Sequence, residues 1–191
     1  MCNGGDTKLG GSGDIPEPNA ELAQYFTPKN VVIALWRLVQ KRLISQENQE
    51  IRAIDLAAGA GVWLDVLIDS GRVRPDDAYG IEIDQRWADR SGVSYTGDGL
   101  LGVFDGVEDG TFDVVVGNPP FGKMSNFCAA MGGPDSRMLA KRFPLWQGLG
   151  KNMDSYPIEL LCVERALQVL RPGGWGVLVL PEGILANAKL Q

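Results

Sequence analysis

The sequence predicts an α/β fold, a mostly parallel β-sheet with helices on both faces. Short apolar runs typical of buried strands alternate with segments that repeat apolar residues at helical spacing. Motifs rich in glycine, proline and acidic residues fall where the apolar runs end, which is the ligand-binding edge of an open parallel sheet. The 191 residues, of which 45% are hydrophobic, give room for one domain with its own core.

The first regular element should be a helix that ends near residue 44. Thr27 is placed as its N-cap and Pro28 as its first residue, and apolar residues then recur along one side. A second helix should follow the turn at 57–61. The clearest helix covers 157–170, with the Arg-Pro-Gly-Gly segment 171–174 as its stop. The expected strands cover 51–56, 78–84, 93–96, 112–117 and 175–180.

The domain should begin near residue 20. Residues 1–19 are rich in Gly, Asp, Asn and Pro and have little to bury, so we expect a flexible tail followed by one domain over 20–191. The segment 119–156 has no clean period and is much longer than a median loop of roughly 4–6 residues. We expect it to be a mobile loop over the site.

Composition excludes several classes of protein. No apolar run approaches the ~20 residues of a membrane-spanning helix, and the first residues lack a secretory pattern, so we expect a cytoplasmic protein. The three cysteines are odd in number and no histidine accompanies them, which favours free thiols over disulfides or a zinc site. The net charge is −6 and the basic residues are scattered. If the substrate is nucleic acid, we therefore expect most of the contacts with its phosphates to come from outside this chain.

Two motifs point to a nucleotide-like ligand. Gly59 and Gly61 lie where a strand enters a helix, so backbone amides could approach a ligand there, although a tight turn explains them as well. A nicotinamide fingerprint would need a small residue where Leu64 stands. Glu82, at the end of the second strand, suits the two hydroxyls of a ribose; the alternative is an exposed strand-end acid.

Two further acids follow strands. Asp98 lies between glycines, where it could accept a hydrogen bond from an adenine amino group or simply form a turn. Asp55 could order the glycine loop or meet a positively charged group of a cofactor. The sequence leaves both choices open.

The segment Asn118-Pro119-Pro120-Phe121 directly follows the fourth strand and indicates chemistry on a planar amine. The lone pair of such an amine is delocalised, and two acceptors that hold its hydrogens out of plane make the nitrogen a better nucleophile. The side-chain oxygen of Asn118 and the carbonyl of Pro119 could be these acceptors, and Phe121 could stack on the flat group. The alternative is an Asn-Pro-Pro turn with Phe121 in the core.

With these motifs in order, the chain resembles the adenine-N6 DNA methyltransferases that use S-adenosylmethionine, and most closely the modification subunits of type I restriction systems. The resemblance covers residues 25–187. It rests on four segments in sequence order: Tyr25–Pro28, Asp55–Gly61, Asn118–Gly122 and Leu170–Leu185.

The resemblance implies a Rossmann-like methyltransferase fold and a role for each motif. The residues expected around S-adenosylmethionine are Phe26, Thr27, Asp55, Ala57, Gly59, Gly61 and Ile83, with Glu82 on the ribose and Asp98 near the adenine. The residues expected at the target amine are Asn118, Pro119, Pro120 and Phe121, with Phe121 stacked on a base swung out of the duplex. Transfer from sulfonium to nitrogen needs no metal.

Three departures from the family pattern set further expectations. Leu56 and Ala58 stand where the family usually has Pro and Cys, and the family's leading helical region is absent. Two more strands normally complete the sheet, so we expect a domain truncated at its C-terminal end, with DNA gripped mainly by a missing segment or by a partner such as a specificity subunit. The alternatives are methylation of an RNA base or a protein glutamine, or a non-catalytic cofactor-binding or assembly module.

Overall fold

The structure is a computed structural model that describes residues 17–18, 24–43, 50–123, 141–144 and 157–186. Most of the predicted tail and most of the predicted loop over the site therefore lie outside the described residues. Among the helices that are described, none combines the length and apolar character needed to cross a membrane.

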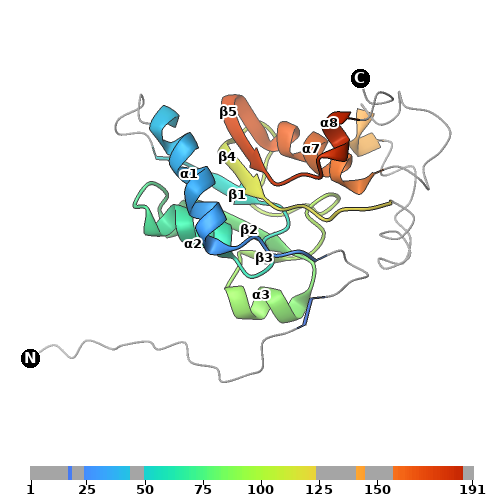
Figure 1. The fold of residues 1–191 in the computed structure, drawn as a ribbon, viewed down its shortest axis with the longest axis horizontal. Helices are drawn as coiled ribbons and strands as arrows, with labels where there is room; N and C mark the ends of the chain where they lie inside the picture. The colour runs from blue at the N-terminus through green and yellow to red at the C-terminus, as the bar shows by residue number, and fades with distance from the viewer. Residues whose placement is uncertain (1–16, 19–23, 44–49, 124–140, 145–156, 187–191) are drawn as a thin grey trace, which may run out of the picture.

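The described strands form one parallel sheet in the order β3-β2-β1-β4-β5, which confirms the predicted architecture. In Figure 1 the strands follow one another from β5 at the top to β3 at the bottom. The strands are β1 (Ala53–Asp55), β2 (Ala78–Glu82), β3 (Tyr95–Thr96), β4 (Phe112–Gly117) and β5 (Leu170–Leu178).

Helices cover both faces of the sheet, as predicted. Ala53 and Val114 belong to a buried cluster with α1 and α2, whereas Ile54 and Val115 belong to a second cluster with α7. This division follows from the strand geometry, because successive side chains point to opposite faces. The helices are α1 (Lys29–Leu43), α2 (Val62–Asp69), α3 (Gln85–Ser91), α7 (Ile158–Val169) and α8 (Gly183–Ala186), with a 3₁₀ turn, η2, at Pro75–Asp77.

The predicted N-cap of the first helix is wrong by one residue. The carbonyl of Pro28 accepts hydrogen bonds from the amides of Val31 (2.9 Å) and Val32 (3.2 Å), and α1 begins at Lys29. The hydroxyl of Thr27 is buried and has no hydrogen-bond partner. Thr27 therefore does not cap α1, and its hydroxyl remains available to a ligand.

The predicted helix end is confirmed, because α7 ends at Val169, but the predicted start of the next strand is wrong, because residues 171–174 already belong to β5. The Asp113 carboxylate, at the start of β4, accepts hydrogen bonds from the amide of Arg52 (2.9 Å) and from Nε of Arg171. This pair holds the segment after α7 beside β4, so that Leu170 pairs with Phe112 after a local shift in register. The strand thus begins five residues earlier than the local Pro-Gly-Gly pattern indicates.

Candidate active site

A cavity opens at the carboxyl ends of the strands, where the sequence places the site. It is lined by segments that follow β1, β2, β3 and β4, by residues 24–27 before α1, and by one side of α7. Most of the predicted site residues line it: Phe26, Thr27, Asp55, Ala57, Gly59, Glu82, Ile83, Asp98, Asn118, Pro119 and Pro120. Gly61 and Phe121 do not.

The glycine loop after β1 is held to β2 through the carboxylate of Glu82. Gly59, with φ +52°, donates its amide to Oε2 of Glu82 at 2.6 Å, and the amide of Asp84 donates to Oε1 at 2.8 Å. Glu82 is buried, and this burial raises the pKa of its carboxyl above the usual range. It is therefore not an exposed strand-end acid; it organises the loop and also lines the cavity.

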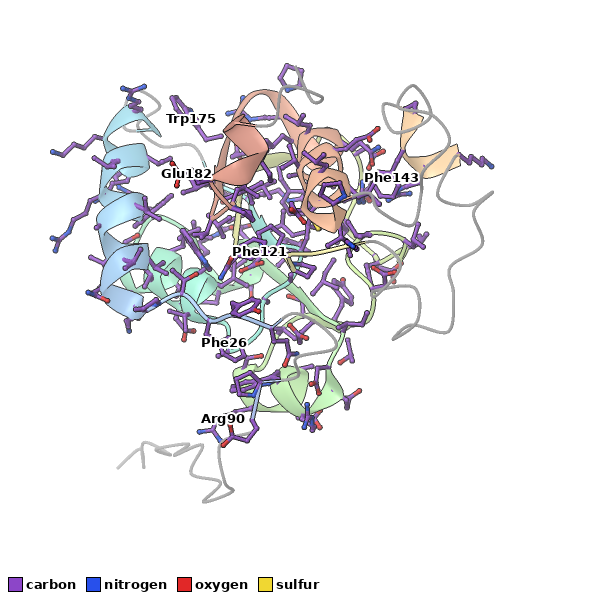
Figure 2. All side chains as sticks on the ribbon, turned by 45° about the vertical axis from the view of Figure 1, so that its right-hand side comes forward. Phe26, Arg90, Phe121, Phe143, Trp175 and Glu182 are labelled. Carbon is purple, nitrogen blue, oxygen red and sulfur yellow. The ribbon has the colours of Figure 1, made fainter. Side chains whose placement is uncertain are left out.

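The ring of Phe26 covers the glycine loop from the other side. A Cβ on Gly59 would lie 2.7 Å from this ring, so only glycine allows the close approach. The Phe26 ring packs against Trp87 of α3 with centroids 4.4 Å apart, and Figure 2 shows Phe26 just above α3. Gly61 lies behind the loop, where it caps α2 with φ +76° and packs against Ser91. Gly61 therefore serves the packing of α2 against α3 and does not line the cavity.

Asp55 lies at the floor of the cavity with one oxygen unused. Its Oδ1 accepts a hydrogen bond from the amide of Ala57 at 3.0 Å, while its buried Oδ2 has no partner. Burial, with a smaller contribution from the negative charge of Glu82, raises the pKa of Asp55 to about 7. A Cβ on Gly117, at the end of β4, would lie 2.7 Å from Oδ1. The close packing of β1 and β4 therefore fixes this carboxyl.

Asp98 both forms a turn and lines the cavity, so the two interpretations left open by the sequence are compatible. Its Oδ1 accepts a hydrogen bond from the amide of Leu100 at 2.8 Å, and burial raises the pKa of its carboxyl. A Cβ on the neighbouring Gly99 would collide with the carbonyl oxygen of Leu56. The loop after β3 is thereby packed backbone to backbone against the loop after β1.

The side chain of Asn118 presents an unused acceptor at the end of β4. Its Nδ2 donates to the backbone carbonyl of Tyr25 at 2.6 Å, and because that carbonyl can only accept, the contact sets which way the amide points. Oδ1 of Asn118 is buried and has no partner. A buried acceptor left unpaired is costly, and its lone pairs suit a donor brought by a ligand.

The motif that begins with Asn118 is pinned at its far end to α7. The amide of Gly122 donates to Oε2 of Glu159 at 3.1 Å, and the amide of Ile158 donates to the carbonyl of Gly122 at 2.9 Å. Between these anchors, the ring of Phe121 stacks on the ring of Tyr25, with centroids 6.0 Å apart and planes 18° apart. Phe121 is thus not a core residue.

The cavity carries acidic groups without basic ones. Asp55, Glu82 and Asp98 line it, and no lysine or arginine does so within the part of the chain that the structure describes. Such a wall disfavours polyphosphate ligands, which need basic side chains or several free amides, and favours a ligand that carries positive charge.

Sequence reasoning missed several lining residues. Tyr25 lies next to the predicted Phe26 but was not identified as a site residue, and its carbonyl contact with Asn118 joins positions 93 residues apart. Trp63 lines the cavity with a buried indole N–H that has no partner. Cys162 lines it from α7 as a buried free thiol, and burial raises its pKa. The helical spacing of Cys162 and Ala166, which both line the cavity, was the available signal.

Comparison with known proteins places most of the chain in one family. Residues 41–191 match the family model described as Eco57I restriction-modification methylase. A comparison with curated proteins found no match.

Solved structures share the fold at low sequence identity. The methyltransferase subunit of a type I restriction-modification system from Streptococcus thermophilus is 21% identical, with a TM-score of 0.60 over 86% of this chain and 36% of that one. The type IIG restriction endonuclease BpuSI is 18% identical, with a TM-score of 0.60 over 84% of this chain and 20% of that one. A DrdV–DNA complex is 16% identical, with a TM-score of 0.61 over 89% and 21%. The chain spans about half or less of the length of these and other matched structures.

Proposed function

Because this chain belongs to the Eco57I restriction-modification methylase family, we propose that it transfers a methyl group from S-adenosylmethionine to the N6 amine of adenine in DNA. The reaction would serve a restriction-modification or related system. Since the chain spans part of the length of its structural neighbours, a further segment or a subunit such as a specificity subunit would supply most of the grip on DNA.

The observation that carries the proposal is the buried, unpartnered Oδ1 of Asn118 at the end of β4. The contact of Nδ2 with the Tyr25 carbonyl aims this oxygen as an acceptor before any substrate arrives. Together with the carbonyl of Pro119, it would hold the two hydrogens of the adenine amine and leave the nitrogen lone pair directed at the methyl group. Such preorganised acceptors act without a strong base.

The cavity fits S-adenosylmethionine in charge and in donor set. The cofactor carries a sulfonium and an ammonium, and the cavity offers acids and no described lysine or arginine. The unused Oδ2 of Asp55 would accept from the ammonium, Glu82 would meet the ribose hydroxyls, and Asp98 would lie near the adenine amino group. Phe26 and Thr27 would close the site from the segment before α1, beside Ala57, Gly59 and Ile83.

When bound, S-adenosylmethionine supplies an electrophilic methyl group, and the residues of the chain supply alignment. Asn118 and Pro119 orient the amine, and Phe121 would stack on the flipped base. The two consecutive prolines, Pro119 and Pro120, restrict the backbone that carries these acceptors, because proline fixes its own φ and restricts the residue before it.

Binding of the cofactor is tested first, by calorimetric titration of the purified chain with S-adenosylmethionine. We expect binding that weakens in Asp55→Ala and in Glu82→Ala, and that is unchanged in Asp76→Ala, an exposed acid outside the cavity. Asn118→Ala should bind nearly as well as the unmodified chain. A folded chain that does not bind would contradict the proposal and favour an assembly module.

The target is tested by methyl transfer from labelled S-adenosylmethionine to unmethylated duplex DNA, to RNA and to protein, with the chain alone and with its partner subunits. We expect label in DNA as N6-methyladenine and its loss in Asn118→Ala. The Asn-Pro-Pro-aromatic arrangement suits any planar amine, so label found only in RNA or in a protein glutamine would overturn the DNA assignment.

A further inference from the structure

Tyr25 stands at the place where a base would meet Phe121. The two rings are nearly parallel, at 18°, with centroids 6.0 Å apart. Tyr25 lines the cavity and Phe121 does not. The tyrosine therefore covers the side of Phe121 that faces the cavity.

A third ring cannot share that side of Phe121 while Tyr25 remains there. Stacked aromatic planes need about 3.4 Å each, so a base inserted between the rings needs about 6.8 Å between the outer planes. The centroid distance of 6.0 Å is an upper limit on the separation of the two planes. Stacking of a base on this side of Phe121 and stacking of Tyr25 are thus mutually exclusive.

The ring of Tyr25 is exposed and, among the described residues, held only by its stacking on Phe121, whereas its backbone carbonyl is held by Asn118. The side chain is 65% exposed, and its hydroxyl makes no hydrogen bond to the described residues. The backbone carbonyl of Tyr25 accepts from Asn118, so a rotation of the side chain leaves this contact in place. The ring can leave Phe121 without disturbing the acceptor that Asn118 presents.

We propose that the ring of Tyr25 occupies the stacking place of the target base on Phe121 and swings aside when a purine enters. The proposal rests on the proposed function, since it concerns the same base. Tyr25 is then a positioning and specificity residue: an entering base must displace a six-membered ring. A purine, with two fused rings, gains more stacking contact than a pyrimidine and displaces the ring more readily.

The test measures stacking directly, without a recognition sequence. The probe is a single-stranded thymidine oligonucleotide with one central 2-aminopurine, whose fluorescence is quenched when it stacks on an aromatic ring. It is titrated against the full chain with S-adenosylhomocysteine present, for the unmodified chain, Tyr25→Ala, Tyr25→Phe, Phe121→Ala and the double variant Tyr25→Ala/Phe121→Ala.

We expect Tyr25→Ala to bind the probe roughly 2- to 10-fold more tightly, which is the range expected for loss of one competing ring pair. Tyr25→Phe keeps the ring and should match the unmodified chain. In the Phe121→Ala background, Tyr25→Ala should change nothing, because no stacking face remains. The Tyr25→Ala variant should also lose discrimination against an unlabelled oligonucleotide with a central cytosine, measured by competition with the 2-aminopurine probe.

Equal or weaker binding in Tyr25→Ala overturns the proposal, as does the absence of quenching in every variant. Methyl transfer by the same variants is measured separately. Tighter probe binding in Tyr25→Ala with no methyl transfer by any chain, even with the partner subunits present, would support the ring exchange and refute the proposed function. Methyl transfer to DNA, together with no increase in probe affinity in Tyr25→Ala, would support the proposed function and refute the ring exchange.

Discussion

At the scale of single residues, the cavity stores unfavourable interactions that a ligand would relieve. Asp55 is 1% exposed, and its Oδ2 has no partner. Oδ1 of Asn118 and the hydroxyl of Thr27 are likewise buried and unpaired. Buried polar atoms without partners cost about 1–3 kcal/mol each, and proteins tend to keep them where they serve a function. Their meeting at one edge of the sheet is what distinguishes a binding site from a turn.

The carboxyl of Asp55 should make the stability of the fold depend on pH. Its pKa is about 7 in the folded chain against 3.8 in the unfolded chain, so the folded state holds the proton more tightly. Stability should therefore fall as the pH rises from about 4 to 7 and then level off, with a loss on the order of 4 kcal/mol. Asp55→Asn keeps the acceptor for the Ala57 amide and removes the ionisation.

Thermal unfolding across pH 4 to 9 checks this expectation. Asp55→Asn should unfold at nearly the same temperature as the unmodified chain at pH 4 and at a higher temperature at pH 8. Asp76→Asn, which changes an exposed acid, should follow the unmodified chain throughout. A variant Asp55→Asn that is less stable at pH 8 would show that the charged carboxyl has a stabilising partner.

Site residues that lie in a local sequence motif could be located from the sequence. Site residues that depend on a contact between distant parts of the chain could not. Asn118, Asp55, Glu82 and Asp98 each end or follow a strand, so an apolar run and its last polar residue were sufficient to locate them. The role of Tyr25 depends on a contact with a residue 93 positions away, and no local pattern encodes that distance. Their functional roles stay predictions.

At the scale of elements, long-range hydrogen bonds set boundaries of helices and strands that local sequence patterns do not predict. The alternation of strands and helices was read correctly because buried strands and amphipathic helices have different periods. The Arg-Pro-Gly-Gly segment correctly indicates the end of α7, but its local pattern does not show that β5 already runs through it, held by the pair of Arg171 with Asp113. Thr27 reads locally as an N-cap, yet α1 begins two residues later.

The contact between α1 and α2 is a second long-range link of this kind. Nε1 of Trp36, which is 2% exposed, donates to Oγ of Ser70 at 2.9 Å, and Oγ donates to the carbonyl of Leu67 at 2.6 Å. Ser70→Ala should destabilise the fold by about 1–3 kcal/mol, because it leaves the buried indole N–H unpaired.

Urea unfolding of a double-mutant cycle measures that link. In a Trp36→Phe background, which has no indole N–H to satisfy, Ser70→Ala should cost clearly less. An equal loss of unfolding free energy in the two backgrounds would mean that Ser70 stabilises only the end of α2, through its bond to Leu67, and does not link α2 to α1.

At the scale of the whole molecule, the charges explain why this chain should hold DNA weakly by itself. The net charge is −6, and many described cations face an acid: Lys29 with Asp69, Arg74 with Glu50, Arg86 with Asp84, Arg165 with Asp109 and Arg171 with Asp113. A phosphate would have to compete with each of these carboxylates. Basic residues are concentrated on α1, whose sequence carries four of them and no acid, although one of the four, Lys29, pairs with Asp69.

Binding of the chain to a duplex should therefore depend only shallowly on salt. A plot of log affinity against log salt concentration, from fluorescence anisotropy at 50–200 mM salt, should have a slope no steeper than about −3, which corresponds to about three phosphate contacts. Reversing two charges on α1, with Arg37→Glu and Lys41→Glu, should flatten the slope by about 1–2, because each lost contact removes roughly 0.9. A slope near −6 or steeper would reveal a basic face beyond α1, and the DNA grip would then belong to this chain and not to a partner.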